Sequence, residues 1–184
     1  MSEADGELRS LMLAYQGGSL EAFQTVYARL APDLYRYLRH LLHGSDVADD
    51  LLQETFLQMH RSRAAYNPAY SVRPWVFGLA RNVFLMNRRA KRRWAAVHEI
   101  RQELPDFPVP PEMERLGSTE EIRRGMMSLS ADQAETLLLH HQWGFTFEEI
   151  AGMLGISSAA ARARASRGIA DLRRALVTRQ RVRI

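Results

Sequence analysis

The chain has 184 residues, of which 46% are hydrophobic and 25% charged, a balance typical of one ordinary domain or two small ones. No apolar run approaches the ~20 residues needed to span a bilayer. The absence of cysteine excludes disulfides, thiolate metal sites and a cysteine nucleophile. Residues 1–7 are polar and acidic, unlike a secretory signal, so we expect a cytoplasmic protein with no membrane insertion.

The distribution of charge is more informative than the net charge of +4. Residues 61–93 contain nine basic residues and no acid, whereas residues 99–121 contain seven acids and two arginines. Residues 162–183 contain eight arginines and one acid. Two basic blocks separated by an acidic stretch indicate a polyanionic partner that is contacted at two places.

Nearly every periodic stretch of the sequence has helical spacing, so we predict an all-α protein. Over residues 23–41 apolar side chains recur at steps of three and four, which predicts an amphipathic helix. Pro32 lies inside this helix and is expected to kink or split it. Residues 44–46 then supply a break and an N-cap for a second helix, which runs to about Arg61.

A loop over residues 65–73 follows, and Pro74 lies in the first turn of a helix that continues to about residue 95. Four of the seven prolines fall within residues 105–111, in acidic sequence that cannot close a core. We therefore predict two small helical domains joined by a flexible linker: a domain over 1–94, a linker over 95–117 and a domain over 118–184.

In the predicted C-terminal domain, capping residues mark the starts of the helices. Ser118, Ser130 and Thr146 each have a Glu or Gln three residues later, which is the capping-box pattern. Gly155 is placed to end the third of these helices, because glycine tolerates the left-handed conformation. Ser157 or Ser158 then caps a final helix that extends to about Val177.

Residues 149–157 have helix-turn-helix spacing, in which a short helix, a glycine turn and a second helix follow one another. The second helix alternates arginines with alanines. Small residues let a helix approach the major groove closely, and Arg can bond bidentately to guanine or to phosphate. This pattern favours DNA binding over the alternative of a solvated, Arg-rich helix, but it leaves the class of DNA-binding protein open.

Two motifs in the N-terminal half indicate which class of DNA-binding protein this is. Residues 46–57 read Asp-Val-Ala-Asp-Asp-Leu-Leu-Gln-Glu-Thr-Phe-Leu, and residues 74–82 read Pro-Trp-Val-Phe-Gly-Leu-Ala-Arg-Asn. Both resemble region two of bacterial extracytoplasmic-function sigma factors, and the helix-turn-helix resembles region four of that family. The resemblance covers roughly residues 20–94 and 118–177, in the family's order and spacing.

The resemblance implies a transcription initiation factor, not an enzyme, that gives RNA polymerase core its promoter specificity. Its polymerase contacts would be the clamp helices of the β′ subunit and the β flap. The docking residues implied are Asp49, Asp50, Gln53 and Glu54. An acidic helix face of this kind would pair with a basic coiled coil, whereas an ordinary solvated face is the alternative interpretation.

The resemblance also implies that residues 66–73 and the next helix open and read the minus-ten promoter element, where aromatic faces and amide edges hold an unstacked base. Tyr66 and Asn82 match base-pocket positions, Tyr70 is a weaker candidate, and Trp75 has a core role as its alternative. The residues implied for minus-ten contact are Tyr66, Asn67, Trp75, Arg81, Asn82, Arg88 and Arg89. The residues implied for the minus-thirty-five element are Ser158, Arg162, Arg164, Ser166 and Arg167.

The final helix departs from the family pattern at its buried positions. Ala160-Ala161 stands where the family usually has Thr-Val, and Ala165 stands where it usually has a bulky aliphatic residue. Either neighbouring aromatic residues supply the missing apolar volume, or this domain is less stable than those of its relatives. The candidates for that volume are Trp143, Phe145 and Phe147.

We predict no metal site and no cofactor, because the histidine pairs His140-His141 and His40/His43 have no cysteine or convergent carboxylates beside them. The family implies promoter DNA and an anti-sigma factor as further partners. Two other functions remain open from the sequence: a dimeric helix-turn-helix regulator of another class, and a sigma-like decoy that titrates an anti-sigma factor.

Overall fold

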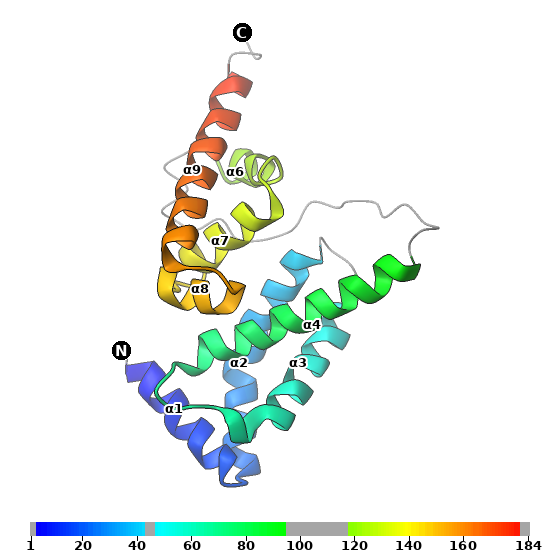
Figure 1. The fold of residues 1–184 in the computed structure, drawn as a ribbon, viewed down its shortest axis with the longest axis vertical. Helices are drawn as coiled ribbons and strands as arrows, with labels where there is room; N and C mark the ends of the chain where they lie inside the picture. Colours follow the sequence, from blue (N-terminus) through cyan, green and yellow to red (C-terminus); the bar gives the residue numbers. More distant parts are fainter. Residues whose placement is uncertain (1–2, 43–46, 95–117, 181–184) are drawn as a thin grey trace. The chain divides into compact units, whose positions relative to one another are not determined.

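The computed structural model describes residues 3–42, 47–94 and 118–180, and every regular element in these ranges is helical. The chain divides into two compact units, residues 1–102 and 103–184 (Figure 1). The elements are α1 (Glu3–Gln16), α2 (Leu20–Leu41), α3 (Ala48–Ser62), a 3₁₀ turn η1 (Arg63–Ala65), α4 (Val72–Trp94), α6 (Thr119–Met126), α7 (Ala131–His141), α8 (Phe147–Leu154) and α9 (Ser158–Gln180).

This arrangement confirms the predicted all-α class. The predicted linker, residues 95–117, lies outside the described residues. Among the helices that the structure describes, none is long and apolar enough to cross a bilayer.

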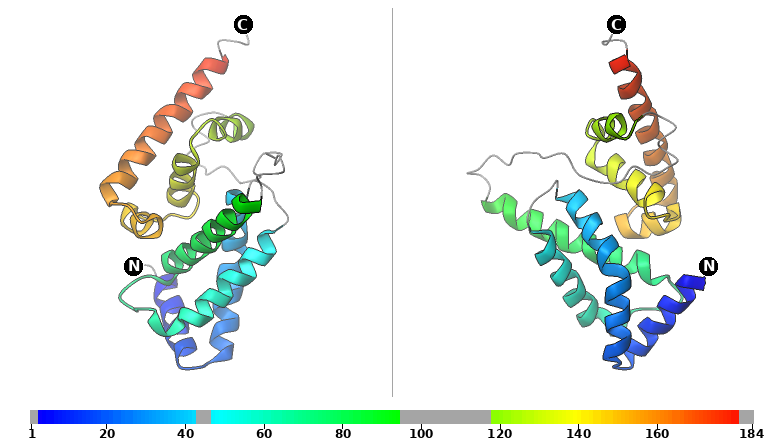
Figure 2. Two further views of the ribbon diagram at one scale, coloured as in Figure 1. Left: turned by 45° about the vertical axis from the view of Figure 1, so that its right-hand side comes forward. Right: turned by 180° about the vertical axis from the view of Figure 1, so that it is seen from behind.

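In the first unit, α2, α3 and α4 pack side by side, and α1 lies against α2 (Figure 2). Each helix turns one apolar face inward, as its periodicity predicts. The core of this unit includes Val26, Leu30, Leu34 and Leu38 of α2, Leu51, Phe56 and Met59 of α3, and Val76, Phe77 and Ala80 of α4, all buried.

Helix α1 precedes every element predicted from the sequence. Leu8, Met12 and Tyr15 recur at helical spacing and are only 4%, 0% and 3% exposed. These three residues carried the periodic signal for a helix, but the pattern is short. They attach α1 to the rest of the first unit.

Pro32 does not split α2, which continues from Leu20 to Leu41, so that part of the prediction is wrong. Proline removes one backbone N–H, which leaves the carbonyl of residue 28 without its helical partner. Pro32 and Ala28 are both exposed, so water can satisfy that carbonyl at little cost.

The predicted N-cap of α3 is also corrected. Helix α3 begins at Ala48 with Val47 at the N-cap position, and no side chain caps it. The predicted break at residues 44–46 lies outside the described residues. Asp49 and Asp50 lie in the first turn of α3, where negative charge favours the positive end of the helix dipole.

In the second unit, α6, α7 and α8 pack against the long helix α9. The three predicted capping boxes, at Ser118, Ser130 and Thr146, are all present. Gly155 ends α8 in the left-handed conformation with φ 68°. The Ser157 hydroxyl accepts from the Ala160 N–H at 3.1 Å, so Ser157 caps α9.

The small residues of α9 are buried against its neighbours. Ala161 and Ala165 are 0% and 6% exposed, while Trp143 and Phe145 are 7% and 3% exposed. A Cβ atom at Gly168 would lie 3.0 Å from Leu137 Cδ1, so α9 approaches α7 closely. Close approach of this kind lets small side chains reach their neighbours, while the supply of apolar volume by Trp143, Phe145 and Phe147 stays a prediction.

We expect opposite effects from two alanine substitutions in α8 and its turn. Gly155→Ala should lower the free energy of unfolding of the second unit by about 1–2 kcal/mol, because alanine is strained at φ +68°. Gly152→Ala, at an exposed helical site with no atom within 4 Å of an added Cβ, should raise it by up to about 1 kcal/mol. Native-state hydrogen exchange of α7 amides measures both, and a loss of stability in Gly152→Ala would contradict this account.

Candidate nucleic-acid and protein interfaces

The outward side of α3 carries the acidic residues predicted for protein docking. Asp49, Asp50 and Gln53 are exposed. Glu54 is half-buried, and its Oε1 accepts from Gln58 Nε2 at 2.7 Å and lies 3.5 Å from the Arg61 guanidinium. Its carboxylate is therefore already engaged within the helix, while the first three side chains face solvent.

Leu57 is a residue of this surface that the sequence reasoning missed. It is 49% exposed and follows Gln53 by one helical turn, on the side of α3 opposite the buried Leu52, Phe56 and Met59. The signal was present, because a leucine there is out of phase with the apolar face. We name Asp49, Asp50, Gln53 and Leu57 the docking face, in which two acids lie about two helical turns before an exposed leucine.

Tyr66 begins the loop between η1 and α4, and its ring is buried, at 4% exposure. The ring lies against Trp75 with 5.0 Å between centroids, and the hydroxyl donates to the Tyr70 carbonyl at 2.6 Å. In this conformation the Tyr66 ring is not accessible to an unstacked base. Tyr66 instead holds the loop closed, and Trp75, which is half-buried, shares that packing role.

The remainder of the loop is a tight turn. The Ala69 N–H donates to Asn67 Oδ1 at 2.9 Å, and the Tyr70 N–H donates to the Asn67 carbonyl at 3.1 Å. This is the local bonding that asparagine commonly provides in turns. Tyr70 is 69% exposed, so it is Tyr70 that presents an aromatic face to solvent in residues 66–71, hereafter the reading loop.

The predicted side chains of α4 lie on its outward half. Trp75, Asn82 and Arg89 are seven residues apart and therefore share one side of the helix, away from the buried Val76 and Ala80. Asn82 and Arg89 are exposed. We name Trp75, Asn82 and Arg89 the outer face of α4.

Two further arginines flank this face. Arg88 is exposed and its guanidinium lies 5.7 Å from the centre of the Phe84 ring, while Arg81 is half-buried. The side chains of residues 91–94 lie outside those that the structure describes.

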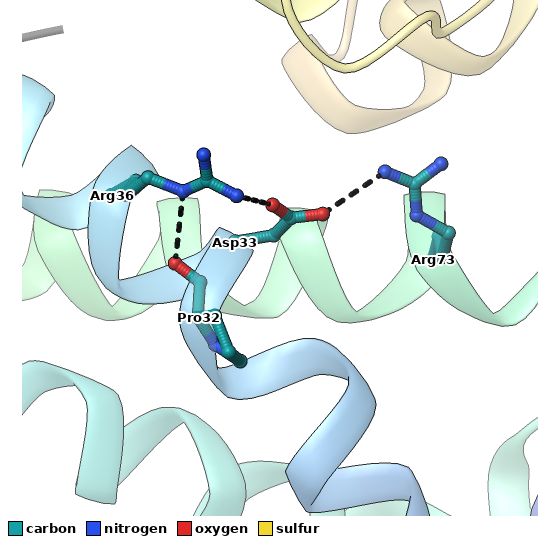
Figure 3. A network of polar contacts seen from close by, with 4 residues as sticks. All are labelled: Pro32, Asp33, Arg36 and Arg73. Atoms are coloured by element: carbon teal, nitrogen blue, oxygen red, sulfur yellow. Dashed lines mark hydrogen bonds and ion pairs between the residues drawn. The ribbon is translucent and has the colours of Figure 1, made fainter. Parts of the chain in front are cut away.

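Asp33 fastens the end of the reading loop to α2 (Figure 3). Its Oδ1 accepts from Arg36 at 2.5 Å, and its Oδ2 lies 3.3 Å from Arg73 at the start of α4. Arg36 Nε also donates to the Pro32 carbonyl at 3.4 Å. The carboxylate thus joins α2 to the first turn of α4 through Arg73.

Helix α9 turns its small side chains both inward and outward. Opposite the buried side lies an exposed surface, and we name its part within residues 159–170 the recognition face. Its residues are Ala159, Ala163, Ser166, Arg167 and Ala170. Ser158 is half-buried in the first turn of the helix.

Two of the three predicted arginine readers flank this face and are paired with acids. Arg162 forms an ion pair with Glu148 of α8, and Arg164 lies 3.4 Å from Asp132 of α7 with its side chain only 20% exposed. Arg167 is exposed and has no ion pair within the described residues. Of the three predicted arginines, Arg167 is therefore the one whose guanidinium is free of an ion pair within the described residues.

The histidines of α7 have a structural role. His140 Nδ1 is 2.8 Å from the Phe145 carbonyl, and the His140 ring stacks on Phe147 with 4.4 Å between centroids. Phe147 thus packs on α7 through His140. No cluster of three or more metal-ligating side chains occurs among the residues that the structure describes.

Burial raises the pKa of Tyr66, and the positive charge of the Arg9 guanidinium opposes this rise. Burial likewise raises the pKa of Tyr15, opposed by Arg63. Both rings belong to the region where α1 meets the start of the reading loop.

Comparison with known proteins gives two family matches. The Sigma-70 region 2 model matches residues 26–94, and the Sigma-70 region 4 model matches residues 119–172. The RNA polymerase sigma factor CarQ of Myxococcus xanthus is 32% identical over 165 residues, which cover 90% of this chain and 95% of CarQ. The ECF RNA polymerase sigma factor SigM of Mycobacterium tuberculosis is 27% identical over 90% of this chain and 83% of its own.

Solved structures share the fold. The sigma factor RpoE of Bartonella quintana, in complex with the anti-sigma factor NepR, has a TM-score of 0.70 at 23% identity and covers 85% of this chain and 98% of its own. CnrH, in complex with the cytosolic domain of CnrY, has a TM-score of 0.68 at 23% identity and covers 96% of this chain and 99% of its own.

The buried tyrosine predicts alkaline sensitivity of the first unit. A raised folded-state pKa means that stability is complete below the unfolded value of about 10 and is lost as pH rises through the folded value. Between about pH 9.5 and pH 11, the melting temperature of Tyr66→Phe should therefore fall less than that of the unmodified chain. At neutral pH it should cost ~1 kcal/mol, because the bond to the Tyr70 carbonyl is lost.

Melting curves from circular dichroism across this range provide the measurement. Tyr70→Phe, which removes an exposed hydroxyl from the same loop, is the matched control. Parallel pH profiles for Tyr66→Phe and the unmodified chain would contradict the burial of the Tyr66 hydroxyl.

Proposed function

This chain belongs to the sigma-70 family, as an extracytoplasmic-function RNA polymerase sigma factor. We therefore propose roles in transcription initiation for the docking face, for the outer face of α4 with the reading loop, and for the recognition face. The protein directs core polymerase to promoters. It would act in the cytoplasm and contribute binding energy towards an opened duplex, with no bond chemistry of its own.

The docking face would bind the clamp helices of the β′ subunit. Its acids supply charge complementary to a basic coiled coil, and Leu57 supplies an apolar contact at its C-terminal end. The exposure of Leu57, at 49%, one helical turn after Gln53 and two after Asp50, is the observation that supports this proposal. Glu54 would support the face through Gln58 and Arg61.

The outer face of α4 and the reading loop would contact the minus-ten element. Asn82 offers an exposed amide edge for a base, and Asn67 retains its side-chain N–H donors when Oδ1 is occupied by Ala69. The DNA phosphates would be contacted by Arg81, Arg88 and Arg89. Binding should therefore depend steeply on salt concentration. Tyr66 would act from within the fold, by holding the loop.

The recognition face would read the minus-thirty-five element, with Arg167 as its central contact. Small alanines let α9 approach the groove, and alanine also packs against thymine methyl groups. Arg162 and Arg164 would contact DNA at the flanks, and Glu148 and Asp132 hold them until phosphate competes. Ser158 and Ser166 would add hydroxyl contacts, and α6 to α9 would include the surface for the β flap.

An anti-sigma factor is the regulatory partner we propose. Both structural relatives described above are recorded with such partners or with a partner's cytosolic domain. Pull-down with the tagged chain from its source cells tests this, and recovery of core polymerase alone would leave the factor regulated by other means.

We expect charge reversal on the docking face to weaken core binding. Asp50→Lys should raise the Kd for core polymerase by about tenfold or more, because a lysine would face a basic partner. The control is Glu21→Lys, the same charge change at an exposed acid in the first turn of α2. Equal effects of the two variants, measured by fluorescence titration, would contradict the docking assignment.

The function as a whole is tested by in vitro transcription with core polymerase on fragmented genomic DNA. Discrete new start sites that share two spaced upstream elements are the expected result. Core binding without new transcripts would favour the decoy, and absence of core binding would favour a dimeric regulator.

On such promoters Asn82→Ala should reduce open-complex formation by about tenfold, since one bidentate base contact contributes roughly 1–3 kcal/mol. Core binding should stay intact. Gln24→Ala, which removes an exposed amide from α2, is the control. Loss of core binding in Asn82→Ala would contradict the assigned role.

A further inference from the structure

Helix α1 makes polar contacts with the segment that leads into the reading loop. It lies before the residues matched by the region 2 model, which begins at residue 26. A hydrogen bond of 2.6 Å joins the Tyr15 hydroxyl to His60 Nδ1. The Arg63 guanidinium lies 5.9 Å from the centre of the Tyr15 ring. Helix α1 is thus bound to the end of α3 and to η1.

Gln16, the last residue of α1, makes the most specific of these contacts. Its Nε2 donates to the Arg63 carbonyl at 2.7 Å and to the Tyr66 carbonyl at 3.0 Å. The Arg63 carbonyl also accepts from the Tyr66 N–H at 3.2 Å, so Gln16 adds a second bond there, and its other N–H gives the Tyr66 carbonyl a partner from α1. Both N–H donors of the amide are used, so the backbone direction at Tyr66 is set by α1.

The reading loop is thereby fixed at both ends. Gln16 holds its start, the Tyr66 hydroxyl bonds to Tyr70 across it, and Asp33 holds its end through Arg73. Of these three contacts, the Gln16 bonds alone come from outside the segment matched by the region 2 model.

We propose that Gln16 is a positioning residue for promoter opening, acting through the Tyr66 carbonyl on the reading loop. This inference rests on the proposed function of that loop. Helix α1 then belongs to the opening machinery, although it presents no DNA-reading side chain of its own in this role. Loss of the two bonds should release the start of the loop without disturbing the docking face on the outward side of α3.

The test compares two templates with the holoenzyme. One is a duplex promoter from the transcription experiment above, and the other is the same promoter with mismatched strands just upstream of the start site. Gln16→Met, which keeps the side-chain length and removes the donors, should reduce open complexes on the duplex roughly tenfold. It should reduce transcription from the mismatched template less than twofold, because the strands are already separated.

Gln24→Met is the matched control, the same substitution at an exposed glutamine of α2, and both templates should be unaffected by it. Equal loss on the two templates in Gln16→Met would show a merely structural role, and no loss on the duplex would also overturn the proposal. Should Gln16→Met fail to bind core, Gln16→Asn, which withdraws the amide by one methylene, is compared in the same way.

The two hypotheses fail differently. If the unmodified holoenzyme opens no duplex promoter, both the proposed function and the positioning role of Gln16 are wrong. If the unmodified holoenzyme opens the duplex and Gln16→Met does so equally well, only the positioning role is wrong.

Discussion

The Tyr66 ring lies between the start of α4 and the body of the first unit, and its hydroxyl bonds to the carbonyl of Tyr70. A buried hydroxyl needs a partner, and here the partner is the backbone of the reading loop itself. The same contact that completes the packing therefore determines the shape of the surface offered to DNA. The Trp75 ring packs on this buried ring, and Tyr70, whose carbonyl accepts the bond, keeps its own side chain exposed.

Burial of Tyr66 changes how the sequence pattern is interpreted. Its position matches the family's base pocket, and an aromatic ring there was predicted to stack on a base. In the described conformation the ring supports the loop, while exposed aromatic area is provided by Tyr70 at 69%. Packing and recognition are thus divided between two tyrosines four residues apart, and one hydrogen bond links them.

In the second unit, the long helix α9 has few large buried side chains with which to pack against its neighbours. Alanines and Gly168 let α9 approach α7, and close approach restores the dispersion contacts that bulky residues would otherwise provide. The arginines on either side are bonded to Glu148 and Asp132. These exposed pairs add little stability, but they restrict where the guanidinium groups point before DNA arrives.

Much of this protein was determined locally by its sequence. The caps at Ser118, Ser130 and Thr146 and the left-handed Gly155 depend on residues within one turn, so the pattern predicted them correctly. The helical class followed from periodicity, and the family followed from two motifs that the Sigma-70 models match.

Contacts between distant residues were decided only by the tertiary structure. The burial of Tyr66 and the pairing of Arg162 with Glu148 depend on which helices meet, and no spacing rule encodes that. The roles of the candidate site residues stay predictions. Gln16 shows the reason most clearly: its amide bonds to carbonyls 47 and 50 residues away, which become neighbours only when α1 packs against α2 and η1.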